Sequence, residues 1–170
     1  MLHFKRWVMV LVCLASSGVM AGENIAVIDV ARAIFSTELS KVRQQEMKSA
    51  PGFVSLQTEY DNINADIKAV QKEVESKKLT LSQEQAAEYK KKMEYLGADM
   101  ELVSRKLQTE IKSLQSKIMK ELQPTALKSV NELVEENKIT LLLQREAVIF
   151  ATPEKDLTGK LVDRMNRNAK

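Results

Sequence analysis

The sequence predicts an α+β fold, in which each chain contributes a small β body and a long antiparallel α-helical hairpin arm. Apolar residues recur at alternating three- and four-residue steps over residues 53–74, and again over residues 89–107. This spacing is typical of a coiled-coil seam. The two seams are reflected about Thr80, so that Ile67 lies as far before it as Met93 lies after it. Short β-branched runs near both chain ends supply the strands of the body.

The first 21 residues predict a secretory signal peptide. Two basic residues precede an apolar run over residues 7–14, which is too brief to span a bilayer. Ala21 supplies the small residue of a cleavage site, so we expect cleavage after Ala21 and a mature chain of residues 22–170. A lipoprotein attached through Cys13 is the alternative, but that cysteine lies inside the apolar run.

Removal of this segment would remove His3, Trp7 and Cys13, which are the only residues of their kinds in the sequence. The mature chain would offer no thiol nucleophile, no imidazole base and none of the usual zinc or copper ligands, so we expect no metal and no cofactor. It could form no disulfide, so packing or association between chains must hold it together. The formal net charge falls from +3 to +1, which is too balanced to indicate nucleic acid as a partner.

The predicted body begins with a buried strand over residues 25–30, which is short and rich in β-branched residues. Residues 31–50 predict a helix with one apolar face. Pro51 and Gly52 should kink or break that helix, and they separate the body from the arm.

The predicted arm covers residues 53–123, which contain no proline and a single glycine, Gly97. This composition permits two long helices joined by a turn over residues 77–81. Ser82 and Gln85 have the spacing of a capping box at the start of the second helix. A glycine inside a helix costs about 1 kcal/mol relative to alanine, so Gly97 indicates a bend or a flexible point in the arm.

After Pro124 the chain is expected to return to the body. The helix should resume beyond this proline, and residues 139–143 and 148–151 then predict a β-hairpin around a three-residue loop. Thr152 as N-cap and Pro153 at the first helical position predict one last amphipathic helix.

The body strands are expected to leave an apolar face that a single chain cannot cover, because a three-stranded sheet is barely stable alone. We therefore expect several chains to pool their strands into one core. The residues predicted for this shared body core are Ile25, Val27, Ile139, Leu141, Leu143, Val148 and Phe150.

The best candidate for a binding surface is the tip of the arm, where folding of the hairpin gathers basic and apolar side chains. One interpretation is that the charges keep an exposed tip soluble, and the other is contact with acidic lipid head groups or with a client chain. The residues of this predicted tip surface are Lys77, Lys78, Leu79, Leu81, Lys90, Lys91 and Lys92.

Catalytic and nucleotide-binding patterns are weak in this sequence. Gly159 and Lys160 look like the end of a phosphate-binding loop, but Glu154 stands where that loop has its first glycine. Glu135 and Glu136 could serve in acid–base chemistry, yet they fall on a predicted helix surface with no histidine nearby in the sequence. We therefore expect the protein not to be an enzyme.

The order of these parts resembles the Skp (OmpH-like) family of periplasmic chaperones of Gram-negative bacteria. The resemblance covers the mature chain and rests on the strand at residues 25–30, the reflected hairpin, the segments 138–143 and 147–150, and the closing segment 156–158. It implies a homotrimer in which strands from three chains form a barrel-like body and three arms enclose a cavity. It also implies a holdase that binds unfolded outer-membrane proteins in that cavity, without ATP, and prevents their aggregation.

The resemblance further implies basic arms and a cluster that binds lipopolysaccharide. This sequence departs from that pattern, because twelve basic residues between positions 53 and 123 are balanced by twelve acidic ones. Residues 103–114 supply only Arg105, Lys106 and Lys112 as basic side chains, opposed by Glu110. Any membrane or lipopolysaccharide contact is therefore expected to be weak.

The predicted organisation is a signal peptide over residues 1–21 and one chaperone domain over residues 22–170. Within that domain, the body comprises residues 22–52 and 124–170, and the arm comprises residues 53–123. We expect the domain to act in the periplasm, because the signal peptide directs export.

The alternative function is a structural coiled-coil adaptor or spacer of the cell envelope. The arm of a spacer would bury its whole seam and keep no apolar surface for clients. Leu79, Tyr95 and Leu102 lie off the main seam, which favours the holdase.

Overall fold

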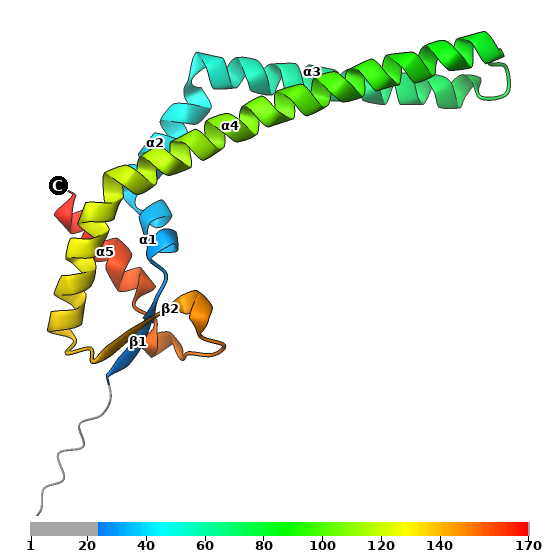
Figure 1. Cartoon of the computed structure of the whole chain (residues 1–170). Coiled ribbons are helices and arrows are strands. Elements are labelled where there is room, and N and C mark those ends of the chain that lie inside the picture. The colour runs from blue at the N-terminus through cyan, green and yellow to red at the C-terminus, as the bar shows by residue number, and fades with distance from the viewer. Residues whose placement is uncertain (1–23, 170) are drawn as a thin grey trace, which may run out of the picture.

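The computed structural model describes residues 24–169, so the predicted signal peptide and its cleavage site lie outside the described residues. Figure 1 shows a small body from which a long two-helix arm projects. The predicted α+β class is confirmed, since a small two-stranded sheet is combined with five α-helices in the described part of the chain.

The sheet of the body consists of β1 (Ile25–Ile28) and β2 (Leu141–Gln144), which pair in parallel. β1 ends before residue 30 because Asp29 is the N-cap of α1 (Val30–Ser36). The Asp29 carboxylate accepts a hydrogen bond from the Arg32 backbone N–H at 2.8 Å, which satisfies a free donor of the first helical turn.

The predicted single helix over residues 31–50 is wrong in one respect, because it divides into α1 and α2 (Glu38–Ser49). Thr37 lies between the two helices in an extended conformation. Its hydroxyl accepts a hydrogen bond from the Ser40 N–H at 3.2 Å, so Thr37 caps α2.

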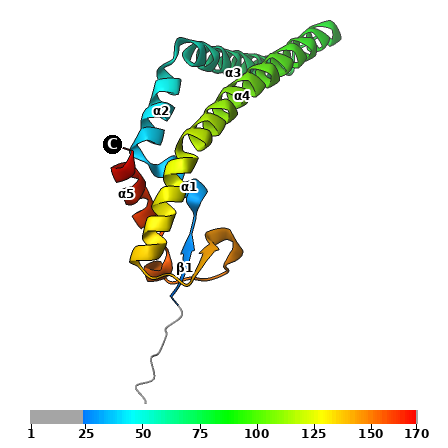
Figure 2. The same ribbon diagram turned by 60° about the vertical axis from the view of Figure 1, so that its left-hand side comes forward.

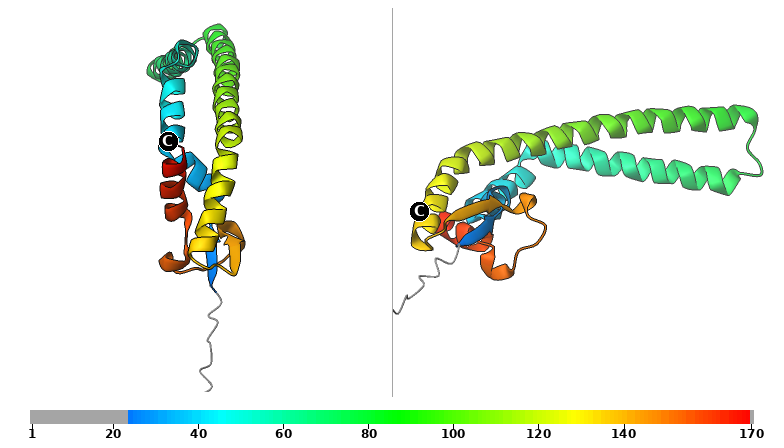
Figure 3. Two further views of the ribbon diagram at one scale, coloured as in Figure 1. Left: turned by 90° about the vertical axis from the view of Figure 1, so that its left-hand side faces the viewer. Right: turned by 60° about the horizontal axis from the view of Figure 1, so that its bottom comes forward.

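The arm consists of α3 (Pro51–Lys77) and most of α4 (Gln83–Glu136), which lie side by side in Figures 1 and 3. The predicted break at Pro51 is confirmed, since this residue occupies the first turn of α3 after an extended residue 50. The predicted capping box is confirmed too. Ser82 Oγ accepts from the Gln85 N–H, and the Gln85 side chain accepts from the Ser82 N–H.

Burial in the arm follows the predicted seam. Val103 and Val70 are its most buried members, at 1% and 2% exposure. Each seam residue is buried or half-buried, and the full set is Phe53, Leu56, Tyr60, Ile63, Ile67, Val70, Val74, Tyr89, Met93, Leu96, Met100, Val103 and Leu107.

α4 continues without a break through Pro124, so the predicted interruption at this residue is wrong. The proline removes one backbone donor, and Figure 1 shows α4 bending in this region, where its colour turns yellow. Leu122 and Ala126 on either side are buried in the core of the body, and this packing holds the helix together across the proline. α4 therefore belongs to both the arm and the body.

The core of the body lies between the sheet, α1, the end of α4 and α5 (Thr158–Asn168), which are seen together in Figure 2. α5 begins later than predicted, because Thr152 and Pro153 start only a short 3₁₀ helix, η2 (Pro153–Lys155). The core residues are Ala26, Ile28, Ala33, Ile34, Ile118, Leu122, Ala126, Leu133, Leu157, Leu161 and Met165.

The predicted β-hairpin is wrong for the described chain. β2 is followed by a 3₁₀ helix, η1 (Arg145–Ala147), and residues 148–151 form no strand. η1 turns the chain away from β2, and within this turn Arg145 Nη1 donates to the Val148 carbonyl oxygen at 2.9 Å. The other side of β1 is occupied by a parallel bridge between Val27 and Asp156. β1 therefore has neighbours on both sides, and residues 148–151 are not among them.

Candidate functional site

The structure brings the predicted tip residues together at the far end of the arm (Figure 1). Lys77 ends α3 and Lys78 caps it, while Leu79 lies in the turn and is fully exposed. Leu81 is half-buried. Lys90, Lys91 and Lys92 follow about two turns into α4.

Lys77 is bound to groups of its own chain. Its ammonium donates to Glu73 Oε1 at 2.6 Å and to Tyr89 Oη at 3.3 Å, and it lies 6.0 Å from the centre of the Tyr89 ring. The hydrogen bond with Glu73, followed by that with Tyr89, raises the pKa of Lys77, and the same lysine lowers the pKa of Glu73. This contact fastens α3 to α4 close to the turn.

The other tip lysines also have partners within the chain. Lys78 and Lys90 lie 3.7 Å and 3.9 Å from carboxylates of Glu75 and Glu94, and Lys91 lies 5.8 Å from the ring of Tyr95. Exposed pairs of this kind contribute little stability, but they offset the charge that the lysines present. The tip is therefore a surface of mixed charge around the exposed Leu79.

The residues predicted for the shared body core have different environments within one chain. Val27 is buried, Ile25, Ile139, Leu143 and Val148 are half-buried, and Leu141 and Phe150 are exposed. Ile149, beside Phe150, is also fully exposed, although the sequence analysis did not select it. Ile149 lies in the apolar run over residues 148–151, and this run is the sequence feature that could have indicated it.

The arm keeps apolar surface outside its seam. Tyr95 and Leu102 are 61% and 46% exposed, and their spacing of seven residues places them on one face of α4. A shallow groove beside Leu102 is lined by Leu56, Arg105 and Lys106, among others. Val54 and Ile111 are two further exposed apolar residues of the arm helices, at 46% and 38% exposure.

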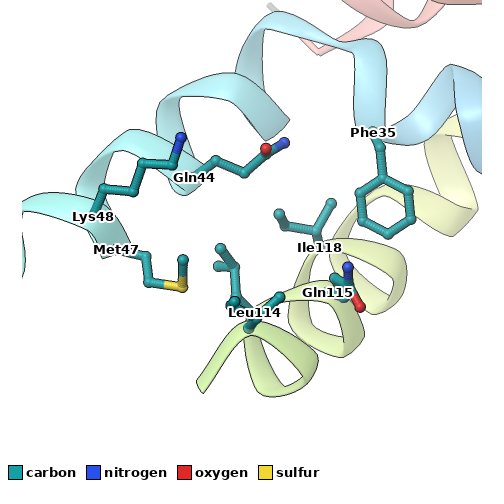
Figure 4. A pocket seen from close by; sticks show the side chains of 8 residues that line it. Phe35, Gln44, Met47, Lys48, Leu114, Gln115 and Ile118 are labelled. Carbon is teal, nitrogen blue, oxygen red and sulfur yellow. The ribbon is translucent and has the colours of Figure 1, made fainter. Parts of the chain in front are cut away.

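A cavity of about 310 Å³ lies at the base of the arm, between α2 and α4 (Figure 4). The apolar side chains of Phe35, Met47, Leu114 and Ile118 surround it, together with polar side chains such as Gln44. The sequence could not show this cavity, because its lining comes from three helices whose relative placement depends on the break at Thr37.

Catalytic features are weak in the structure as well. Glu136 forms an ion pair with Arg164, which also contacts Glu132 at 3.1 Å. The hydrogen bond from Arg164 lowers the pKa of Glu136, and this carboxylate is engaged in that structural contact on the surface of α4. Within residues 24–169, no group of His, Cys, Asp and Glu side chains could hold a metal ion, and none of the helices combines the length and the hydropathy that a membrane span requires.

Comparisons with known proteins place the chain in a family. The family model described as outer membrane protein (OmpH-like) matches residues 24–165, so the chain belongs to the OmpH-like family, and the resemblance to the Skp (OmpH-like) family is confirmed. The Skp-like protein of Pseudomonas aeruginosa is 22% identical over 168 residues, which cover 98% of this chain and 99% of that protein. Family membership supports a chaperone role.

One solved structure is also similar. It is a crystal structure described as that of an OmpH-like outer membrane chaperone from Caulobacter crescentus. That chain is 20% identical, the match covers 85% of this chain and 84% of that one, and the TM-score is 0.49.

Proposed function

We propose that this chain is an ATP-independent periplasmic holdase, which binds unfolded outer-membrane proteins between helical arms and prevents their aggregation. Membership of the OmpH-like family supports the chaperone role. The observation that carries the proposal is the apolar surface that the arm keeps outside its own seam, at Tyr95 and Leu102. An arm that served only as a rigid spacer would have no need of this surface.

The apolar surface of the arm is suited to the segments that an unfolded client exposes. An unfolded β-barrel protein exposes alternating apolar strands that pair with one another in water. A protein that binds the unfolded chain lowers the concentration of the aggregating species by mass action. Tyr95 and Leu102 lie beside the basic residues Lys91 and Arg105, so the surface offers apolar contact with a charged border. Binding of this kind needs neither ATP nor a catalytic group.

The proposed assembly is a homotrimer formed through the body, with the predicted shared body core as its interface. Within residues 24–169, β2 pairs with β1 alone, so its other edge is free. Leu141, Ile149 and Phe150 are 47–104% exposed nearby in the chain, and soluble proteins seldom leave such side chains uncovered. Strands contributed by neighbouring chains would cover both features. The tip surface is proposed as a second, weaker contact with clients or acidic lipids.

The test is native mass spectrometry of the mature chain, alone and mixed with a porin diluted from urea. We expect a trimer that gains one porin, together with suppression of porin turbidity. The double variant Tyr95→Ser, Leu102→Ser should remain a trimer and suppress turbidity several-fold less well. Leu127→Ser is the matched control, because Leu127 is 59% exposed but follows the bend of α4 at Pro124, outside the arm. A monomer that ignores the porin, or equal loss of activity in both variants, would contradict the proposal.

Localisation has its own measurement. The mature protein should be recovered from the periplasmic fraction, and N-terminal sequencing should begin at Gly22. Recovery of an uncleaved chain, or of one that begins at a lipidated Cys13, would contradict this part of the proposal.

A further inference from the structure

The middle of the arm has an unusual charge distribution. The mid-arm segment is defined here as residues 59–66 of α3 and residues 94–101 of α4, which lie opposite one another in the hairpin. It contains no lysine or arginine. Its six acidic residues are Glu59, Asp61, Asp66, Glu94, Asp99 and Glu101.

These carboxylates have little compensation. Glu94 and Glu101 approach Lys90 and Arg105 at 3.9 Å and 3.7 Å, and both partners lie outside the segment. The other four carboxylates have no ion pair with any residue in the described range 24–169. Glu59 and Asp66 of α3 and Asp99 of α4 line the same shallow groove between the helices, so like charges gather there.

The backbone of the segment is also weakly helical. Asp61, Asn62 and Asn64 follow closely on α3, and their short polar side chains compete with the helix for backbone hydrogen bonds. Gly97 lies in the opposing half, and a Cβ atom placed on it would meet no atom within 4 Å. Packing therefore does not require glycine at this position, although glycine disfavours the helix.

We propose that the mid-arm segment is a charge-sensitive weak point, which opens locally while the outer part of the arm stays closed. The outer part is fastened by the contact of Lys77 with Glu73 and Tyr89, and by the capping box at Ser82. Repulsion between the exposed carboxylates drives the opening, so screening by salt closes the segment. The arm can then bend halfway along its length. This local opening does not depend on the proposed holdase function.

Hydrogen exchange of the mature protein without client tests the opening directly, so its failure is separate from failure of the holdase assay. We expect faster exchange in peptides of residues 59–66 and 94–101 than in residues 68–76 nearer the tip. Raising NaCl from 10 to 300 mM should slow exchange in the mid-arm segment several-fold, and it should not slow exchange in the tip peptides, where salt screens the attraction between Lys77 and Glu73 instead. Exchange that rises steadily from the body to the tip, without a mid-arm maximum, would overturn the proposal.

Two pairs of variants separate the effect of backbone helix propensity from the effect of charge repulsion. Gly97→Ala should slow mid-arm exchange about five-fold, whereas the matched control Gly52→Ala, which also meets no atom within 4 Å, should not. Asp99→Asn keeps shape and helix propensity but removes one opposing charge, so it should slow exchange in both halves of the segment. Glu110→Gln on the same helix, outside the segment, is its control. Equal effects within each pair would overturn the proposal.

Discussion

The body and the arm of this chain are held together in different ways. In the body, Ile34, Ile118 and Leu161 come from α1, α4 and α5, and each is almost completely buried. In the arm, two helices share one seam, most of whose members are only half-buried. The arm adds local contacts such as the pair between Lys77 and Glu73. The body therefore depends on packing between distant parts of the sequence, and the arm depends on a row of modest contacts and on its caps.

The largest expected effect comes from truncation of one buried residue in each region, which compares how tightly the two regions are packed. Leu161→Ala should lower the free energy of unfolding of the body by about 3 kcal/mol, because it leaves a cavity in a packed core. Val103→Ala in the seam should cost about 1.5 kcal/mol, since it removes two buried methyl groups. Urea unfolding followed by circular dichroism measures both. Equal losses would show that the seam is packed as tightly as the body.

A smaller effect is expected at the start of α4. Ser82→Ala removes the hydroxyl that accepts from the Gln85 N–H, and loss of an N-cap costs about 1 kcal/mol. Exchange should rise in the first turns of α4 and not in the body. Ser76→Ala is the matched control, because the Ser76 hydroxyl donates to the Glu73 carbonyl inside α3 and caps nothing. A loss that spreads into the body would contradict the separation of the two regions.

The smallest effect is the loss of stability at low pH that we expect from the contacts between α4 and α5. Asn168 and Arg164 donate to Glu132, and Arg164 donates to Glu136, so the pKa of each carboxyl is lowered in the folded protein. A carboxyl of this kind stabilises the fold above its unfolded pKa, and that stability is lost as the pH falls through the folded pKa. We expect the urea midpoint of the body to fall when the pH is lowered below about 4.5.

The double variant Glu132→Gln, Glu136→Gln is the control for this prediction. Its urea midpoint should depend less steeply on pH, because neither side chain can take up a proton in that range. Asp156, whose pKa is lowered by its hydrogen bonds with Thr158, remains in both proteins and accounts for part of the acid sensitivity. Identical pH dependence in the two proteins would contradict a role for the Arg164 contacts.

The arm could be predicted from the sequence because its determinants are local. The alternating spacing of residues such as Ile63 and Val70 defines one face of a helix, and the capping box needs only Ser82 and Gln85. The reflection about Thr80 then fixes which residues meet. Even the turn is where the sequence predicts it, between Lys77 and the start of α4.

The body could not be predicted in the same detail, because its contacts join distant residues. β1 pairs in parallel with β2, more than 100 residues away. No local pattern shows that β2 pairs with this distant strand and not with residues 148–151, which directly follow it in the sequence. The side-chain contact from Arg145 to the Val148 carbonyl lies just beyond the point where the chain leaves the sheet, and no sequence pattern indicates it. The helix continues through Pro124 for a related reason. The packing of the neighbouring residues overrides the local preference of proline to end a helix.

The continuity of α4 has a mechanical consequence. Its 54 residues form one continuous rod of about 80 Å that bends near Pro124, with one end packed in the body and the other at the tip of the arm. About 60 Å of that rod lies on the arm side of Pro124, so a rotation of about 5° at the proline displaces the far end by about 5 Å. The rod is thus a lever that enlarges small rearrangements of the body. A change too slight to see in the core becomes, at the tip of the arm, a displacement as wide as one turn of helix.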